Sequence, residues 1–314
     1  MITAPAIVIE DHQMEGVAAE LARRIPGASV RAYEPMASHT TFRIGGPADI
    51  YVQPLNLEQL AEVTRFAREH GLPVMVIGNG SNLLVGDRGV RGIVVRLAPS
   101  FSDIEWLDDG LVAGGGARLA KLVRDSAEAG LSGLESTVGI PGTLGGALAM
   151  NAGTDTGCIG DLVASATMLE ESGEVREWDE TQLAYKYRHS GIRAAKVAVL
   201  SARLRLRPAP VEEIRAKIER LRQKRASRQP LTAWSAGSAF KNPRGAAAGK
   251  VLHRAGAKGM RMGDAQVSTK HANFLINRRR ATAAEMRELI ERAHALASRR
   301  YGIDLELEIE MIGE

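Results

Sequence analysis

Val138-Gly-Ile-Pro-Gly-Thr-Leu-Gly-Gly-Ala-Leu-Ala-Met-Asn-Ala-Gly153 is the stretch that decides the fold of this 314-residue chain. It lies in a run without charged residues from Ser136 to Thr154. That length approaches the about 20 apolar residues of a membrane span. Five glycines and Pro141 would make a poor helix, because glycine costs roughly 1 kcal/mol and proline about 3 relative to alanine. Glycines at this density let backbone lie flat against a ligand, so we expect a ligand-contacting loop, with a packed structural turn as the alternative.

Length and composition exclude several classes of protein. At about 100–200 residues per domain, the chain corresponds to two or three domains. Cys158 is the single cysteine, so an internal disulfide and a cysteine metal cluster are impossible. The seven histidines are scattered without metal-ligand spacing, and we expect no metal site. The first residues lack a basic segment followed by a long apolar one, which predicts a cytoplasmic protein without a membrane span.

The net charge of +4 is concentrated in one predicted helix. Residues 211–230 hold seven Lys or Arg against three Glu. Such a segment is a solvated face, a site for a phosphate-bearing ligand, or a nucleic-acid contact. Nucleic acid is disfavoured because no aromatic residues interleave with the basic ones.

Pro208 and Pro210 interrupt the series of predicted elements, and we place a domain boundary there. Asn56, with Gln59 three residues later, predicts a helix start. Alternation at the C-terminus places Glu306, Glu308 and Glu310 on one strand face, where they repel one another unless solvated or paired with cations. Helices are predicted at 15–24, 57–70, 118–129, 211–227, 246–255 and 283–301, and strands at 50–53, 73–77, 83–85, 92–97, 111–114, 162–170, 175–178, 197–206, 271–277 and 305–311.

A second glycine-rich segment, Gly78-Asn-Gly-Ser-Asn82, directly follows a predicted strand. Its exposed N–H groups can cradle an anion, and a hairpin turn is the alternative. The Gly-x-Gly-x-x-Gly fingerprint fails because Leu83 stands at the third glycine position. A dinucleotide-binding fold of Rossmann type is therefore not indicated.

Six motifs follow one another along the chain. They are His39-Thr-Thr-Phe-Arg-Ile-Gly-Gly-Pro-Ala-Asp49, Gly78-Asn-Gly-Ser-Asn82, Gly139-Ile-Pro-Gly-Thr-x-Gly-Gly146 with Asn151-Ala-Gly153, Tyr187-Arg188-x-Ser190, Gly237-Ser-x-Phe-Lys-Asn-Pro243 and Ala265-Gln-Val-Ser with Lys270-His-Ala-Asn-Phe274. In this order they resemble the UDP-N-acetylenolpyruvoylglucosamine reductases, flavoenzymes that make UDP-N-acetylmuramate for bacterial peptidoglycan. The similarity spans about residue 35 to the C-terminus. The short run from Ser190 to Val197 resembles the branch without an extra substrate-capping loop.

The resemblance implies an α+β fold with an FAD-binding domain of the vanillyl-alcohol-oxidase (PCMH) type. That domain would cover residues 35–208 in two subdomains, about 35–98 and 99–208, after an N-terminal helical segment at 1–34. A substrate-binding α+β domain at 209–302 would follow, and a C-terminal strand at 303–314 would carry Glu308 back to the active site. We expect a monomer that acts on a small molecule and contacts neither nucleic acid nor membrane.

The resemblance also implies the reaction. NADPH reduces FAD and leaves, and the enol ether then enters the same site. The reduced flavin gives hydride to the vinyl carbon, and the other alkene carbon is protonated. Negative charge then develops on the substrate carboxylate, and it must be stabilised by a fixed cation and hydrogen-bond donors.

By resemblance, three residues carry this chemistry. Arg188 is the cation, and Ser238 is the proton donor, with Lys241 as a candidate support for its alkoxide. Glu308 holds Arg188 or shares a proton with the carboxylate. The residues alone do not choose Glu308 over Glu306 or Glu310.

The resemblance assigns binding roles to the glycine-rich and basic segments. FAD pyrophosphate is expected at the N–H groups of Gly78, Asn79, Gly80, Ser81 and Asn82. The basic residues Lys224, Arg225 and Arg228 are candidates for the UDP diphosphate. Another flavin oxidase or dehydrogenase of the same fold is the nearest alternative. The remaining flavin contacts are expected at Gly139, Pro141, Gly142, Thr143, Gly145, Gly146 and Asn151, and the remaining substrate contacts at Tyr187, Lys241, Asn242 and Gln266.

Overall fold

The first unit of the fold is a four-stranded sheet covered by two helices. The computed structural model describes residues 13–195 and 198–314, so residues 1–12 of the predicted N-terminal segment and the predicted strand start at Val197 lie outside the described residues. The strands follow the order β1-β2-β5-β3, with one antiparallel pair and two parallel pairs. The elements are α1 (Gln13–Arg24), β1 (Ser29–Pro35), β2 (Pro47–Gln53), α2 (Leu57–Glu69), β3 (Val74–Ile77) and β5 (Val90–Arg96).

Alternation along β2 decides which face the helices cover. Ile50 and Val52 are fully buried in one cluster with the apolar residues of α1 and α2, while Tyr51 faces the opposite cluster, as expected of successive strand residues. The Oδ1 atom of Asn56 accepts a hydrogen bond from the N–H of Gln59 at 2.9 Å, which confirms the predicted start of α2.

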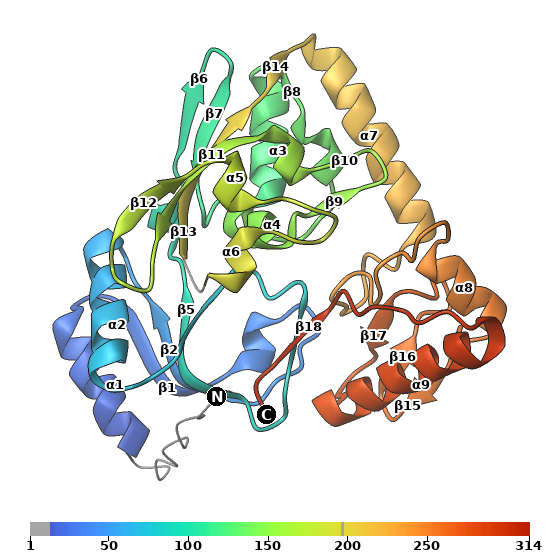
Figure 1. Cartoon of the computed structure of the whole chain (residues 1–314), viewed down its shortest axis with the longest axis horizontal. Helices are drawn as coiled ribbons and strands as arrows, with labels where there is room; N and C mark the ends of the chain where they lie inside the picture. Colours follow the sequence, from blue (N-terminus) through green and yellow to red (C-terminus); the bar gives the residue numbers. More distant parts are fainter. Residues whose placement is uncertain (1–12, 196–197) are drawn as a thin grey trace.

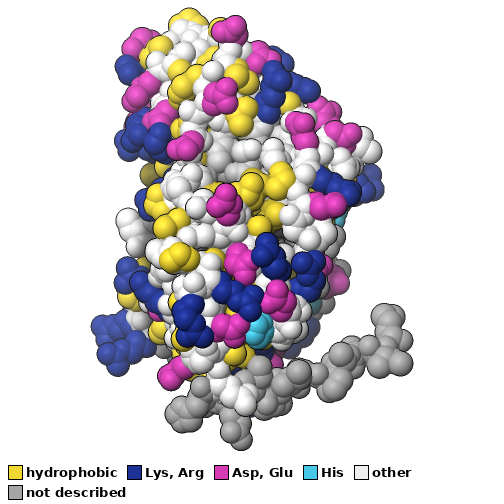
Figure 2. Space-filling view, turned by 90° about the vertical axis from the view of Figure 1, so that its left-hand side faces the viewer, with side chains coloured by type: hydrophobic (Ala, Val, Ile, Leu, Met, Phe, Trp, Pro, Cys, Tyr) yellow, Lys and Arg dark blue, Asp and Glu magenta, His cyan; other side chains and the backbone are white. Residues whose placement is uncertain are grey.

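The outer surface of this unit carries mixed charge. Figure 2 shows Lys and Arg side chains interspersed with Asp and Glu over the face that it presents. Arg24 of α1 pairs with Glu20, Glu62 and Glu69. Such a face lacks the excess of positive charge with which proteins bind a nucleic-acid backbone.

The second unit is a five-stranded antiparallel sheet in the order β12-β11-β13-β7-β6. Its apolar face packs with α3 and α4 in one hydrophobic cluster. The short strands β8 (Leu131–Ser132) and β14 (Arg207–Pro208) pair beside it, as do β9 (Gly153–Thr154) and β10 (Gly157–Cys158). The larger elements are β6 (Ile104–Leu107), β7 (Gly110–Gly114), α3 (Leu119–Glu128), α4 (Leu144–Met150), β11 (Val163–Leu169), β12 (Val175–Trp178), α5 (Glu180–Leu183), α6 (Gly191–Ala194) and β13 (Ala198–Arg205).

The third unit is reached through the basic helix α7 (Val211–Arg228), which runs along one side of the molecule (Figure 1). A three-stranded sheet, β15-β16-β17, packs there against two helices. Its other elements are α8 (Ala248–Ala255), β15 (Arg261–Met262), β16 (Ala265–Val267), β17 (Leu275–Asn277) and α9 (Ala283–Tyr301).

The C-terminal segment returns from the third unit to the first (Figure 1). There β18 (Glu310–Ile312) pairs in parallel with β4 (Leu83–Val85). Asp87, just after β4, accepts hydrogen bonds from the first N–H groups of α9 at Ala283 and Ala284, at 2.7 and 2.9 Å. These contacts fix the third unit beside the segment at 78–82.

The helix inside the glycine-rich stretch corrects the sequence analysis, which rejected a helix there. Residues 144–150 form α4, and Thr143 caps it by accepting the N–H of Gly146 at 3.3 Å. Leu144, Ala147 and Leu148 are buried, so tertiary packing outweighs the low helix propensity of two glycines. Gly145 is useful in this packing, because a Cβ atom there would lie 3.1 Å from the carbonyl oxygen of Gly115.

Two predicted strands are shorter than expected. The segment 271–277 is a strand only at Leu275–Asn277, and 305–311 is replaced by β18 at Glu310–Ile312. Residues before each strand turn to reach other partners, and Leu307 makes only an isolated bridge to Phe240. Among the described residues, no helix is long and apolar enough to cross a bilayer.

Candidate active site

A cavity of about 1920 Å³ is lined by all three units. Pockets for drug-sized ligands have volumes of roughly 300–1,000 Å³, so this cavity has room for a large cofactor and a second ligand together. Main chain from the two glycine-rich stretches forms one wall, and side chains from α7, the third unit and the C-terminal segment form the others.

All five residues of the segment 78–82 line the cavity. Gly80 has a φ of +58°, and a Cβ atom there would lie 2.1 Å from the carbonyl oxygen of His39. A Cβ atom on Gly78 would lie 2.5 Å from Oγ1 of Thr143. Only glycine therefore lets this loop pack against its neighbours and present its backbone to the cavity.

The predicted flavin contacts at 139–151 divide into two groups. Pro141, Gly142, Thr143 and Gly146 line the cavity. The other three do not line it and have other neighbours. These are Gly139, which is covered by Arg225, Gly145, which packs on Gly115, and Asn151, whose side chain bonds to Lys186 and Gly160.

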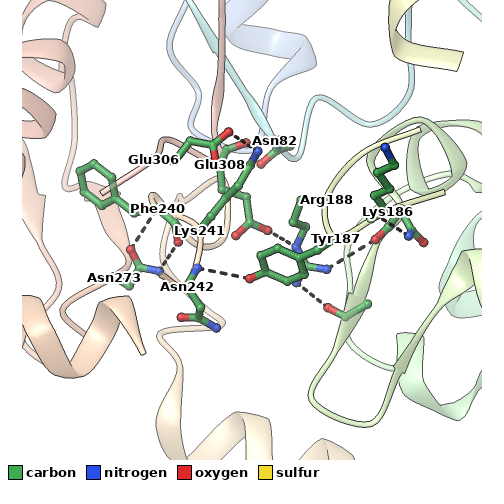
Figure 3. A network of polar contacts seen from close by, with 12 residues as sticks. Asn82, Lys186, Tyr187, Arg188, Phe240, Lys241, Asn242, Asn273, Glu306 and Glu308 are labelled. Atoms are coloured by element: carbon green, nitrogen blue, oxygen red, sulfur yellow. Dashed lines mark hydrogen bonds and ion pairs between the residues drawn. The ribbon is translucent and has the colours of Figure 1, made fainter. Parts of the chain in front are cut away.

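An ion pair between Arg188 and Glu308 lies on the cavity wall (Figure 3). Nε of Arg188 donates to Oε1 of Glu308 at 2.5 Å, and the two side chains are 17% and 15% exposed. Nη2 of Arg188 also donates to the carbonyl oxygen of Gly153 at 2.9 Å. Burial raises the pKa of Glu308 above its usual value, although the charges of Arg188 and Lys241 act against the shift. The pair is thus a fixed guanidinium beside a carboxyl that is easier to protonate than usual.

Ser238 lies next to this pair through the backbone. The N–H of Glu308 donates to the carbonyl oxygen of Ala239 at 2.8 Å, and both Ser238 and Glu308 line the cavity. Gly237, with a φ of +80°, supplies the left-handed turn that leads into Ser238. Three segments far apart in sequence therefore bring Arg188, Ser238 and Glu308 to one wall.

The three carboxylates of the C-terminal segment each meet a cation. Glu306 pairs with Lys241, Glu308 with Arg188, and Glu310 with Arg193 at 3.5 Å. Repulsion among them is relieved in this way. The pair at Glu308 is tied by a backbone hydrogen bond to Ala239, the residue after Ser238.

The predicted substrate contacts also divide. Tyr187, Lys224, Arg228 and Asn242 line the cavity, whereas Lys241 and Gln266 do not. Lys241 pairs with Glu306 (Figure 3), so its side chain already has a carboxylate partner. Gln266 donates to the carbonyl oxygen of Gly259 at 3.3 Å.

Sequence reasoning missed several basic residues that the third unit contributes to the cavity wall. His271 lies inside a quoted motif, and its Nδ1 atom accepts the N–H of Asn273 at 3.2 Å. Burial and the charge of Lys258 lower the pKa of His271. The positions of Lys250 and His253 in α8 do not distinguish cavity residues from solvent-exposed ones in the sequence. The missed residues are Lys250, His253, Lys258, Lys270 and His271.

No group of His, Cys, Asp or Glu in the described ranges could hold a metal ion. A backbone wall with few side chains, joined to a sheet-and-helix second unit, fits the elongated, partly apolar and partly anionic FAD molecule. The fold and this wall together define a flavoprotein with an FAD-binding domain of the vanillyl-alcohol-oxidase type.

Comparison with known proteins agrees with this class. Residues 48–179 match the FAD binding domain model, and residues 229–312 match the UDP-N-acetylenolpyruvoylglucosamine reductase C-terminal domain model. The chain belongs to the UDP-N-acetylenolpyruvoylglucosamine reductase family and is an FAD-dependent oxidoreductase. The resemblance and the fold class expected from the sequence are confirmed.

The relatives that support this assignment cover nearly the whole chain. A reductase of this name from Agathobacter rectalis is 44% identical over 93% of this chain and 96% of its own length. One from Moorella thermoacetica is 46% identical over 90% of this chain and 92% of its own length. The crystal structure of the Thermus caldophilus reductase, 36% identical, superposes with a TM-score of 0.79 over 91% of this chain and 98% of that chain.

Proposed function

We propose that this protein uses NADPH and FAD to reduce UDP-N-acetyl-3-O-(1-carboxyvinyl)glucosamine to UDP-N-acetylmuramate. The observation that carries the proposal is the Arg188–Glu308 pair, at 2.5 Å, on the same cavity wall as Ser238. A cation, a carboxyl and a hydroxyl beside a flavin site match the demands of reducing an enol ether next to a carboxylate.

The residues that would hold FAD are those of the backbone wall. Segment 78–82 offers N–H groups for the pyrophosphate, and Pro141, Gly142, Thr143 and Gly146 would contact the rest of the cofactor. Bound FAD would supply hydride transfer, first accepting a hydride from NADPH and then donating it to the vinyl carbon.

The chain's own residues manage the charge and the proton. Arg188 binds the substrate carboxylate and stabilises the negative charge that develops there. Glu308 orients the Arg188 guanidinium. Ser238 gives its proton to the alkene carbon that does not receive hydride. We place this reaction in cytoplasmic synthesis of peptidoglycan precursors by a monomer, since one chain supplies every group named.

The test is NADPH oxidation, followed at 340 nm (an absorbance of the cofactor), with and without the UDP-enolpyruvyl sugar. We expect a yellow protein whose steady NADPH consumption requires the sugar and yields UDP-N-acetylmuramate. Consumption that depends on oxygen and ignores the sugar would favour a different flavin oxidase of the same fold.

Replacing Gly146 with valine is expected to lower flavin content. A Cβ atom on Gly146 has only Oγ1 of Thr143 nearby, at 3.5 Å, so the side chain extends into the cavity. Overpacking costs about 1–3 kcal/mol, roughly 5- to 150-fold in cofactor affinity. The flavin-to-protein absorbance ratio measures the loss. Gly16→Val is the matched control, because Gly16 is a helical glycine with nothing within 4 Å. Equal flavin in both variants would contradict the assignment of this wall.

Replacing Lys224 or Arg228 with methionine is expected to raise the KM for the UDP sugar about 3- to 10-fold, with a smaller change for NADPH. Both side chains line the cavity, but Lys224 pairs with Asp155 at 2.6 Å and Arg228 is exposed, so screening limits the effect. Steady-state kinetics at two salt concentrations measure it. Arg222→Met, an exposed position of the same helix, is the control. If the KM values of these variants equal that of the control, the basic segment is a solvent-exposed face and does not bind the substrate.

A further inference from the structure

Arg225 differs from the other basic residues of α7, because its side chain turns inward. Lys224 pairs with Asp155 and Arg222 with Glu219. The Arg225 side chain instead lies over Gly139 in the glycine-rich stretch, where Nε is 3.2 Å from the position that a Cβ atom of Gly139 would take. Arg225 also lines the cavity. Because Gly139 has no side chain, the guanidinium of Arg225 has room to lie there.

The guanidinium of Arg225 forms no ion pair within the part of the chain that the structure describes. Its Nε atom is buried without a hydrogen-bond partner. Burial and the positive charge of Arg188 lower the pKa of Arg225, against the opposite effect of Asp155. A half-buried guanidinium whose Nε atom has no partner is unfavourable, so this position is suited to an anionic ligand group.

The neighbouring charges indicate which anionic group this is. Arg188 and Glu308 together are neutral, and so are Lys224 and Asp155. Arg225 thus adds a positive charge that neither of these two pairs offsets. Nη2 of Arg188 donates to the carbonyl oxygen of Gly153, and Asp155, two residues further along, pairs with Lys224, the chain neighbour of Arg225. Arg225 therefore lies on the side of the cavity where the proposed function puts the substrate carboxylate.

We propose that Arg225 binds the carboxylate of the enolpyruvyl group together with Arg188. This inference rests on the proposed function and revises the sequence-based grouping of Arg225 with the diphosphate ligands. Two guanidinium groups face the carboxylate, and Glu308 neutralises only one of them. Arg225 therefore supplies the net positive charge that holds the carboxylate and the further negative charge that develops on it after hydride addition.

The test compares two ligands that differ in the carboxylate. The UDP-enolpyruvyl sugar and UDP-N-acetylglucosamine share the uridine, the diphosphate and the sugar, and only the first has a carboxylate. Their dissociation constants are measured by calorimetry on the oxidised holoenzyme. Arg225→Met is expected to weaken binding of the enolpyruvyl sugar about 10- to 100-fold, while UDP-N-acetylglucosamine binds within about twofold of wild type. Arg222→Met is the control and is expected to change neither ligand.

Other outcomes separate the inference from the function. An equal loss of affinity for both ligands would assign Arg225 to the diphosphate, and no loss for either would show that Arg225 does not contact the substrate. Either result overturns the inference, while turnover of the enolpyruvyl sugar by the wild-type protein still supports the proposed function. A wild-type protein that neither binds nor reduces the enolpyruvyl sugar overturns both. Flavin content and Tm report the fold of each variant. If the methionine variant does not fold, Arg225→Lys is used instead, because it keeps the charge but loses the planar guanidinium fork. It is expected to weaken binding of the enolpyruvyl sugar by a smaller factor and to leave binding of UDP-N-acetylglucosamine unchanged.

Discussion

Replacing Ser238 with alanine is expected to abolish reduction of the enol ether while reduction of the flavin by NADPH stays nearly unchanged. The variant removes one hydroxyl from a wall whose main chain is fixed by the bonds of Ala239 to Asn273 and Glu308, so the cavity keeps its shape. General acid catalysis contributes about 10²- to 10⁴-fold, and the second half-reaction should slow by that factor. Stopped-flow absorbance of the flavin separates the two half-reactions.

The control for this experiment is Ser298→Ala, because Ser298 is exposed on α9. It should leave both half-reactions at the wild-type rate. An equal loss of both half-reactions in Ser238→Ala would remove Ser238 from the role of proton donor, since only the second step needs a proton on carbon.

Replacing Arg188 with methionine is expected to slow substrate reduction by about 10²- to 10³-fold, the usual effect of losing one donor to a developing anion. The substitution also leaves the carboxyl of Glu308 without its cation. Because the charge of Arg188 lowers the pKa of Glu308 against the effect of burial, the variant should hold Glu308 protonated to higher pH than wild type.

The pH profile therefore gives Arg188→Met a second measurement. In wild type, activity that needs the Glu308 carboxylate falls as the pH drops through a pKa higher than that of an ordinary glutamate, and in the variant this fall should begin at higher pH. Arg203→Met breaks an exposed ion pair with Asp109 and should change neither rate nor profile. A variant with the wild-type profile would contradict the coupling between Arg188 and Glu308.

Local sequence signals predicted much of the fold. The amphipathic pattern and the Asn56 cap located α2, and the glycines of 78–82 located a backbone wall. The helix α4 could not be predicted, because it is stabilised by a threonine cap and by contacts with Gly115, which is remote in sequence. The strand predicted at 305–311 is too long, because alternation of apolar and polar residues indicates which side chains are buried. It does not indicate which backbone N–H groups pair with another strand.

The site was predicted where motifs carried it and missed where only the tertiary structure places a side chain. Alternation left three glutamates equivalent, and only the fold shows that Lys241, Arg188 and Arg193 each take one. The same fold gives Lys241 a carboxylate partner in Glu306. Arg225 looks like any basic residue of α7 until Gly139 is found beneath its side chain.

A wall made of main chain also bears on antibiotic resistance. A compound that hydrogen-bonds to the N–H groups of segment 78–82 would meet few escape mutations, because every substitution except one by proline leaves those groups in place. Gly78 and Gly80 have no room for even one added carbon, so a blocking side chain at either position would damage the protein's own loop. A compound held by the exposed Arg228 would have no such protection.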